Sequence, residues 1–479
     1  MRVTFAFPQW TGAYGWIGYF ARRNSTWPPL NLALLAACVE QAGHEAQIVD
    51  GQVEGLSPKQ LARRVLQGSP DVVGFTATSP FFALQLEAAR IIKEEAPRIR
   101  VILGGPHVTI VKGQIDEPYI DHLFTGECED VLPDFLDALR RGEAPPRIIA
   151  GKRPKDFDDL PLPARHLLPM RRYKLGTLKG REHFTSIQTT RGCPWACSFC
   201  ASDALDTRSI FRRSPLSVLD EIRHVVSAYG ITHFYIVDDV LTLYREHIEK
   251  LCDLLIDSGT RITFEGSTRA NLIDEKLIRK MKRAGLVRLS FGLESVNANV
   301  RDLMRKKVPM QHYVTSNRLL NEHGIEALNS TMIGLPGDTR DTINQTIDWV
   351  AENRDIQQAN LSIAVPYPGT EFHDMAVAGL HGLKLHTDDF SQYRRYGTAV
   401  TTVNGMTPQD LVDLQNEGFV RIYSKSWRWR PMYGKHGAFG FALMMFRIAK
   451  MVFAKWLRST VSTEGMAVGH VGSPKTPNG

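Results

Sequence analysis

Three cysteines lie in one short stretch of the chain, Arg191 to Cys200, which reads RGCPWACSFC. Cys193, Cys197 and Cys200 are separated by three residues and then by two, whereas the other three of the six cysteines are isolated in the sequence. A disulfide uses thiols in pairs, and a structural zinc site takes four ligands, usually as two separated pairs. The trio therefore predicts a group that takes three thiolates and a further ligand from elsewhere, although the spacing alone leaves zinc or a purely structural role open.

An iron–sulfur cluster matches this donor set, because such clusters prefer thiolate ligands. Three thiolates can hold three irons of a [4Fe–4S] cluster, and the fourth iron then stays open to a substrate or cofactor. The chain has 479 residues and only six cysteines, which do not make a disulfide framework. Clustered thiols of this kind indicate a reducing compartment and a metal or redox role.

The elements around this stretch indicate how it is positioned. From residue 183 to about 400, short apolar runs rich in β-branched residues alternate with helix-like segments. Six such units predict an open, partial (β/α)6 barrel, and the cysteine stretch follows the first strand, on the face where barrel chemistry occurs. One predicted helix begins with Ser214 as its cap and Pro215 at its first position. Its apolar face is expected to hold Leu216, Leu219, Ile222, Val225 and Tyr229.

Residues 1–150 show a separate series of short apolar runs and amphipathic stretches, one of which ends at Gly43. The five expected strands cover residues 3–7, 45–50, 72–77, 100–105 and 122–127. This alternation predicts an α/β fold with a doubly wound parallel sheet, which binds ligands beyond the carboxyl ends of its strands. A polar, Pro-rich segment, residues 151–182, is interpreted as a linker to the barrel.

The cysteine motif resembles that of the radical SAM (S-adenosylmethionine) superfamily, with the aromatic Phe199 just before the third cysteine. Further stretches fit at the expected strand ends, among them FGLES with Glu294 and IGLPGDT with Gly334. The resemblance implies that Cys193, Cys197 and Cys200 ligate the cluster, and that SAM chelates the open iron. It also implies SAM contacts from Phe199, Glu294, Gly334 and Lys306, with Arg305 and Lys307 as competitors for the last role. Asp238 and Asp239, after the second strand, are alternatively a helix cap with a solvated neighbour.

The N-terminal series resembles the flavodoxin-like cobalamin-binding domain that is fused to one branch of this superfamily. Many such domains use an Asp-x-His-x-x-Gly loop, in which the histidine ligates cobalt. Here Asp50 and Gly55 fit that loop, but Gln52 stands where the histidine would be. A cobalt bond from this loop is therefore not expected, and a vestigial domain that binds nothing stays open. The resemblance implies a cobalamin site formed by Asp50, Gln52, Thr76, Ser79, Gly104, Gly105, His107, Gly126 and Glu127.

The family implies an enzyme that cleaves SAM reductively, removes hydrogen from an unactivated carbon and transfers a methyl group by way of cobalamin. An alternative within the family resembles the anaerobic tetrapyrrole ring cyclase, in which hydrogen abstraction leads to ring closure without net methyl transfer. A non-catalytic sensor of cobalamin and cluster, and an RNA-modifying enzyme, are readings from other classes. Phosphate-loop, H-E-x-x-H and G-x-S-x-G motifs are absent from the sequence. The expected partners are a small hydrophobic substrate and a reductant such as a flavodoxin or ferredoxin, with no nucleic acid.

The C-terminal region, residues 401–479, is expected to be helical and basic, with a disordered end. Between Arg421 and Arg458 there are nine Lys or Arg residues and no Asp or Glu, interleaved with aromatic residues. Arg447, Lys450 and Lys455 share one arc of a helix that is otherwise apolar, which is typical of helices lying at a membrane interface. A core-packed terminal helix is the alternative. Because no apolar run reaches the length of a spanning helix and no cleavable signal is visible, we expect a cytoplasmic protein with possible membrane association.

Overall fold

The structure is a computed structural model that describes residues 1–11, 26–177, 180–205, 208–430, 432–434, 437–446 and 448–449. The side chains of residues 176–181 are outside this description. Two predictions fall outside it as well, namely the basic arc of Arg447, Lys450 and Lys455 and the disordered chain end.

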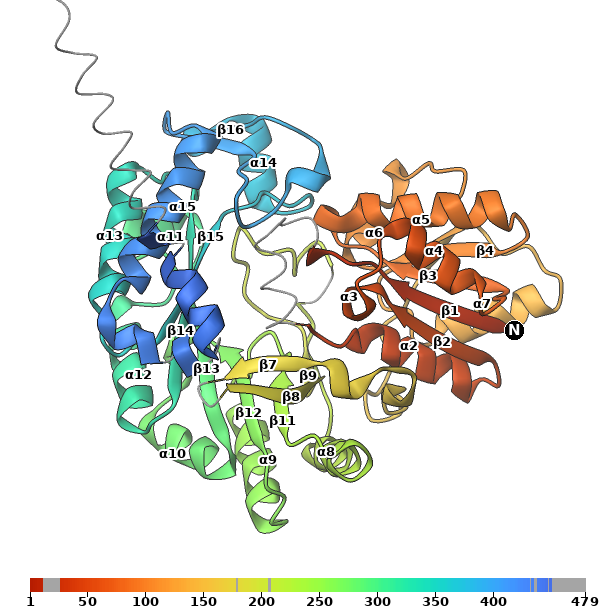
Figure 1. Ribbon diagram of the computed structural model, residues 1–479, viewed down its shortest axis with the longest axis horizontal. Helices are drawn as coiled ribbons and strands as arrows, with labels where there is room; N and C mark the ends of the chain where they lie inside the picture. Colours follow the sequence, from red (N-terminus) through yellow and green to blue (C-terminus); the bar gives the residue numbers. More distant parts are fainter. Residues whose placement is uncertain are drawn as a thin grey trace, which may run out of the picture.

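The N-terminal domain is a six-stranded parallel sheet with the order β2-β1-β3-β4-β5-β6, shown in red to orange in Figure 1. Its strands are β1 (Arg2–Phe7), β2 (Glu45–Asp50), β3 (Val72–Thr76), β4 (Arg100–Gly104), β5 (His122–Thr125) and β6 (Ile148–Ala150). Its helices are α2 (Leu30–Gln41), α3 (Gly51–Glu54), α4 (Pro58–Leu66), α5 (Phe82–Glu95), α6 (Pro106–Val111) and α7 (Val131–Arg140), with 3₁₀ turns η2 (Ser79–Phe81) and η3 (Lys112–Gln114). The predicted doubly wound sheet is confirmed. Strand β6 was not predicted, because its three residues lie at the sheet edge and are largely exposed.

The two faces of this sheet belong to different hydrophobic cores. Side chains such as Val73 and Leu103 pack with α4, α5 and α6 in a core confined to the N-terminal domain. Side chains on the opposite face, such as Phe5 and Phe124, pack with α2 and α7 in a core that continues into the barrel. Trp27, in the WPP stretch before α2, makes edge contacts with Phe184 and Tyr235 of the barrel strands. The α2 face of the sheet is thus the one fixed against the second domain.

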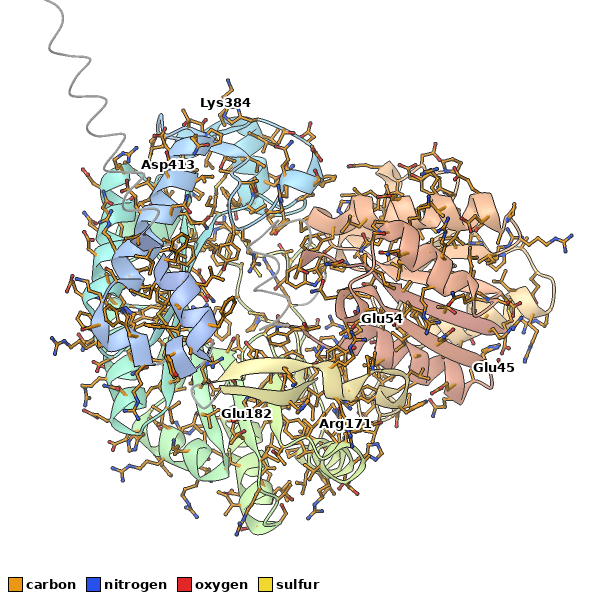
Figure 2. The ribbon with its side chains drawn as sticks, viewed as in Figure 1. Glu45, Glu54, Arg171, Glu182, Lys384 and Asp413 are labelled. Carbon is orange, nitrogen blue, oxygen red and sulfur yellow. The ribbon has the colours of Figure 1, made fainter. Side chains whose placement is uncertain are left out.

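Residues 151–173 connect the domains with only short 3₁₀ turns, η4 (Arg165–Leu167) and η5 (Met170–Arg172). The structure places strand β7 (Lys174–Thr177) and the start of β8 (Gly180–Ile187) inside the predicted linker, where they pair antiparallel. Figure 2 shows Glu182 beside these two strands. The segment is extended at the sheet edge, and its short length gave no alternation from which a strand could be predicted.

The second domain is a seven-stranded sheet with the order β15-β14-β13-β12-β11-β8-β7, in yellow to blue in Figure 1. Six of its strands are parallel, as the partial (β/α)6 barrel predicted. After β8 they are β11 (His233–Ile236), β12 (Thr263–Thr268), β13 (Leu286–Glu294), β14 (Glu326–Ile333) and β15 (Gln358–Ile363). The helices between them are α8 (Pro215–Tyr229), α9 (Arg245–Asp257), α10 (Glu275–Ala284), α11 (Ala298–Leu303), α12 (Met310–Glu322) and α13 (Arg340–Glu352), with the 3₁₀ turn η6 (Ala270–Leu272) after β12.

Helix α8 begins as its sequence indicates, since Ser214 caps it by accepting from the Ser217 amide and Pro215 follows. Its buried face differs from the prediction at one position. Leu216 is 56% exposed, and the buried face includes Val218 and Glu221 instead. A buried glutamate counts as polar in a hydrophobicity pattern, so its inward direction could not be read from the sequence.

The C-terminal region wraps back onto the barrel. Its elements are α14 (Glu371–Ala378), η7 (Leu380–Gly382), β16 (Leu383–Leu385), η8 (Phe390–Gln392), β17 (Thr401–Val403), α15 (Pro408–Tyr423) and η9 (Ser426–Arg428). Helix α15 lies against α13 and β15, and the buried Arg428 donates to the carbonyls of Val350 and Asn353 at the end of α13. Within the described residues no helix is long and apolar enough to cross a membrane.

Candidate functional site

The cysteine loop begins where the first barrel strands end. After β8 the chain forms the two-residue strand β9 (Thr190–Arg191), which pairs antiparallel with β10 (Phe211–Arg212). This short ladder closes the base of the segment that carries the three thiols. Gly192, the first residue beyond β9, has φ +107°, a conformation that favours glycine. A glycine is therefore favoured at the turn that leads from β9 to Cys193.

Two acidic residues after β11 hold the entrance of this loop. The buried Asp238 accepts hydrogen bonds from the amides of Thr189 (2.7 Å) and Thr190 (3.0 Å) and from the Thr189 hydroxyl. Burial raises the pKa of Asp238 to about 6, although these hydrogen bonds lower it. Asp239 is exposed, and its Oδ2 accepts from the Gly192 amide at 3.0 Å. The helix-cap interpretation of Asp238 is therefore wrong, because its partners follow the neighbouring strand β8, at the start of the cysteine loop, and the next helix begins only at Arg245.

The far side of the loop is fixed by backbone contacts of Ser198. Its amide donates to the Met304 carbonyl at 3.1 Å, and its carbonyl accepts from the Phe372 amide at 2.9 Å. The Ser198 hydroxyl donates to the Leu303 carbonyl at 3.3 Å. The end of α11 and the start of α14 therefore hold the loop between the second and third cysteines.

The three thiols are free and partly exposed, and they are close enough to affect one another electrostatically. Burial is the main cause that raises the pKa of Cys193, and Asp239, Cys200 and Cys197 raise it further. The described residues do not contain three metal-ligating side chains already assembled around one point. The donor set nevertheless fits a cluster, because the thiols belong to one anchored loop and lie beside the barrel mouth.

Two of the predicted SAM contacts form a buried ion pair. Glu294, the last residue of β13, pairs with Lys306 at 3.3 Å, and each side chain is about one-tenth exposed. Glu294 has φ +63°, a strained conformation for a residue other than glycine, at an irregularity in the register with β14. Gly292 makes room for the pair, since a Cβ there would lie 2.3 Å from the Glu294 Oε1. Lys306 also lies 5.9 Å from the centre of the Phe199 ring, so these three predicted residues come together.

The structure adds Arg269, which the sequence did not indicate. Arg269 follows β12, is 7% exposed and stacks on Trp195 of the cysteine loop at 4.2 Å. Among the described residues its Nε donates to no acceptor. A buried guanidinium with a free donor beside the cysteine loop is suited to an anionic group of a ligand. Gly334, the remaining predicted SAM contact, lies at the end of β14, where a Cβ would meet Leu411 of α15 at 3.0 Å.

A cavity of about 390 Å³ lies on the α2 face of the N-terminal sheet and reaches the carboxyl ends of its strands. Its apolar walls include Phe5, Leu35 and Phe124. Its floor is hollowed at Gly74, where a Cβ would come within 3.0 Å of the Phe5 ring. Five of the residues predicted to contact cobalamin line it, namely Thr76, Gly104, Gly105, Gly126 and Glu127. The apolar walls suit a largely apolar group, such as the benzimidazole tail of cobalamin.

Asp50 and Gln52 do not line the cavity. Asp50 caps α3 through the amides of Gln52 and Val53 and accepts from the Tyr173 hydroxyl at 2.7 Å, and burial raises its pKa to about 6. Gln52 is fully buried and bonds to Thr11. These two residues of the altered cobalamin loop therefore have structural partners of their own.

Ser79 and His107 also lie outside the cavity lining and contact each other, with the Ser79 Oγ 3.0 Å from the His107 Nδ1. The His107 ring packs between Phe82 and Phe390, and Phe390 belongs to the second domain. Burial lowers the pKa of His107 to about 4, so the ring is neutral at ordinary pH. Its place in the structure is an aromatic contact between the two domains.

Several lining residues were not predicted, because they come from outside the strand ends. Asn31 of α2 donates to the Thr76 hydroxyl at 3.2 Å, and Phe157 and Pro161 of the linker cover the cavity. The barrel contributes Arg191 and Arg213 at one end. The only signal in the sequence was the Pro-rich, aromatic composition of the linker, which did not indicate that it covers a site.

Comparison with known protein families agrees with the two-part organisation. Residues 187–350 match the radical SAM superfamily, and residues 17–136 match the B12 binding domain. The first match contains the cysteine loop and the strands β11 to β14, and the second contains all predicted cobalamin contacts.

Individual proteins resemble the chain over most of its length. It is 30% identical to an uncharacterized methyltransferase of Pyrococcus horikoshii, over 84% of this chain and 88% of that one. It is 26% identical to the anaerobic magnesium-protoporphyrin IX monomethyl ester cyclase of Rubrivivax gelatinosus, over 88% of this chain and 77% of that one. Among solved structures, the radical S-adenosylmethionine methyltransferase TsrM of Kitasatospora setae, with cobalamin and a [4Fe–4S] cluster bound, matches with a TM-score of 0.66 at 17% identity. That match covers 88% of each chain and concerns the fold.

Proposed function

The chain belongs to the radical SAM enzymes with an N-terminal B12-binding domain, and from this premise we propose that it methylates an unactivated carbon of a small hydrophobic substrate. The observation that carries the proposal is the juxtaposition of the two sites. Arg191, two residues before Cys193, forms ion pairs with Glu127 and Glu129 at the rim of the apolar cavity. The cysteine loop and the cavity are therefore neighbours, as a reaction that uses both cofactors requires.

In this proposal Cys193, Cys197 and Cys200 hold the cluster. When bound, the cluster supplies the electron that cleaves SAM, and cobalamin supplies the carrier of the methyl group. The chain's own contribution is to fix the loop through Asp238, Asp239 and the backbone of Ser198. Because the thiols are only partly exposed, water would have restricted access to the group they hold.

The residues around the barrel mouth would hold SAM. We assign the sulfonium cosubstrate to the side of the barrel mouth formed by Phe199, Glu294 and Lys306, with Gly334 at the neighbouring strand end. Lys306 is already neutralised by Glu294, whereas Arg269 has a free donor, so Arg269 suits the carboxylate of the methionine part. Glu294 then serves the amino or ribose groups, which donate hydrogen bonds.

The cavity would hold the tail of cobalamin through Thr76, Gly104, Gly105, Gly126 and Glu127. Asp50, Gln52, Ser79 and His107 would act indirectly, by shaping the strand ends above it. Because Gln52 replaces the histidine of the usual loop and forms a hydrogen bond with Thr11, this loop would supply no imidazole ligand to bound cobalamin. Without such a strong donor, cobalamin would exchange its methyl group more readily.

The C-terminal aromatic residues suggest where a hydrophobic substrate is met. In the described part of the helical stretch 437–446, Phe439 is 70% and Phe446 is 65% exposed. They are seven positions apart, about two helical turns, so they lie on one face of the helix. This exposure favours the interfacial interpretation over a core-packed helix. We propose that residues 438–458 contact an anionic membrane surface and that a flavodoxin or ferredoxin supplies electrons.

The reaction is tested by anaerobic reconstitution with iron, sulfide and cobalamin, followed by SAM and a reductant. Formation of both 5′-deoxyadenosine and S-adenosylhomocysteine supports methyl transfer. Formation of 5′-deoxyadenosine alone supports the oxidative, cyclase-like alternative, which the similarity to the Rubrivivax cyclase keeps in view. If neither product forms, the enzymatic function is contradicted and the non-catalytic sensor becomes the better interpretation.

The membrane contact is tested separately. Deletion of residues 438–458 is expected to abolish sedimentation of the protein with anionic vesicles, and unchanged sedimentation would refute the contact.

A further inference from the structure

A cluster of charged residues joins the cysteine loop to the rim of the apolar cavity. The Arg191 Nη1 donates to Glu127 at 2.6 Å and to Glu129 at 2.9 Å. The other Oε of Glu127 accepts from the Arg153 Nε at 2.6 Å. The Arg191 side chain is 17% exposed and that of Glu129 8%, so the pair is shielded from water and salt.

The position of Arg191 is fixed from several sides. Its guanidinium donates to the Gln188 side chain at 3.3 Å and lies 4.5 Å from the centre of the Phe157 ring. Its backbone belongs to β9, which closes the base of the cysteine loop. Burial lowers the pKa of Arg191, but the carboxylates of Glu129 and Glu127 outweigh it and raise the pKa, so the guanidinium stays charged. Arg191 therefore cannot move without breaking ion pairs of the N-terminal domain.

The same residues line the cavity. Glu127, Glu129, Gln188, Arg191 and Phe157 all belong to its wall. A group that fills the cavity therefore touches the atoms that hold the base of the cysteine loop. Conversely, a cluster that orders the loop would further restrain the backbone of Arg191 in β9, and with it the ion pairs to the two carboxylates that line the cavity. The two sites share one set of contacts, which is the structural requirement for energetic coupling between them.

We propose that Arg191 is a positioning residue that couples occupancy of the cavity to order in the cysteine loop through Glu127 and Glu129. Binding of cobalamin then favours assembly of the cluster, and the assembled cluster raises the affinity for cobalamin by the same factor, since coupling is reciprocal. This inference rests on the proposed function, because it takes cobalamin and a cluster as the two ligands. It adds that their sites do not load independently.

The test measures cobalamin affinity of the full chain with and without a reconstituted cluster. Hydroxocobalamin is titrated anaerobically by absorbance into both forms, and iron content and the electron paramagnetic resonance spectrum establish the state of the cluster. For the wild-type chain we expect the cluster to tighten cobalamin binding by about tenfold, within the usual range of coupling between sites. In Arg191→Gln and in Glu129→Gln the ratio of the two affinities is expected to fall toward one.

A matched control is Arg172→Gln. Arg172 of the linker also contacts the N-terminal domain, donating to the Val53 carbonyl at 2.6 Å, but it neither pairs with a carboxylate of the cavity wall nor lines the cavity. This variant is expected to keep the wild-type ratio. Arg191→Lys keeps the charge but cannot bridge two carboxylates as a guanidinium does, so it is expected to keep part of the difference in cobalamin affinity. It replaces Arg191→Gln in the test if that variant does not fold.

The outcomes separate this inference from the proposed function. Equal cobalamin affinity of the two wild-type forms, or an unchanged ratio in Arg191→Gln, would overturn the coupling while leaving the cofactor assignment intact. If the difference in affinity is lost in Arg172→Gln as well, the specific role of Arg191 is overturned in favour of a general effect of contacts with the N-terminal domain. If the wild-type chain binds no cobalamin in either form, the proposed function falls and this inference with it.

Discussion

Replacement of Asp238 by alanine is expected to destabilise the protein and to prevent proper assembly of the cluster. The carboxylate accepts from the amides of Thr189 and Thr190, and the substitution leaves both donors buried without a partner. Each unpaired buried donor costs about 1–3 kcal/mol, so we expect a loss of about 2–6 kcal/mol in the free energy of unfolding. The loosened segment is the one that leads into Gly192 and Cys193, so iron bound after reconstitution should fall as well.

The matched variant is Asp238→Asn, whose remaining oxygen can still accept from both amides. It should keep iron binding close to that of the wild type and differ from it in pH dependence. The pKa of Asp238 rises from an ordinary 3.8 to about 6 on folding. Because the folded pKa lies above the unfolded one, the protonated Asp238 stabilises the fold fully below about pH 4, and this stabilisation is lost as the pH rises through about 6. At about 1.4 kcal/mol per pKa unit, the loss in the free energy of unfolding amounts to about 3 kcal/mol. The Asp238→Asn variant has no group that titrates here, so it should not show this loss.

Urea unfolding at pH 7.5 and at pH 4, together with iron content after anaerobic reconstitution, measures both effects. The reasoning is refuted if Asp238→Ala unfolds at the wild-type urea concentration and binds the wild-type amount of iron. It is also refuted if Asp238→Asn loses iron as severely as the alanine variant, because the charge and not the hydrogen bonding would then be essential.

Three further predictions concern the other parts of the site. Gly104→Val should weaken cobalamin binding more than tenfold by filling the cavity, whereas Gly113→Val, where a Cβ meets nothing within 4 Å, should bind normally in the same absorbance titration. Lys306→Met leaves the buried Glu294 unpaired, so it should lower the free energy of unfolding, measured with urea, by about 3–5 kcal/mol. It should also lower the affinity for SAM in equilibrium dialysis, and wild-type values for both quantities would contradict the assignment of this site. Asp50→Asn should raise the melting temperature relative to the wild type at pH 7.5 and not at pH 4, since burial raises the pKa of Asp50 to about 6; a gain that is equal at both pH values would contradict this cause.

The sequence predicted the elements whose pattern is local. The six parallel barrel strands and the cap of α8 at Ser214 follow from short apolar runs and from Ser-Pro at a helix start. The failure at Leu216 shows the limit of this reasoning. Glu221 occupies the buried face because Arg165 and Arg213 pair with it, and an ion pair between distant segments has no periodicity in the sequence.

The candidate site was predictable where one motif carries it and not where two domains form it. The three cysteines and the Glu294 end of β13 belong to recognisable stretches. Arg269 stacks on Trp195 from another strand end, and Arg191 pairs with Glu127 across the domain boundary, so neither contact could be seen without the fold. The same holds for the linker, whose aromatic residues cover the cavity only once both domains are in place.

The central claim is that the thiols of Cys193, Cys197 and Cys200 together hold the cluster that cleaves SAM. The most direct measurement replaces each of them in turn with alanine, reconstitutes the protein anaerobically, and determines iron per chain and 5′-deoxyadenosine formed from SAM. Cys252→Ala, a buried cysteine of α9 away from the loop, is the control. The account predicts that each loop variant loses the cluster and SAM cleavage while the control keeps both. A loop variant that retains wild-type iron and cleaves SAM would contradict it.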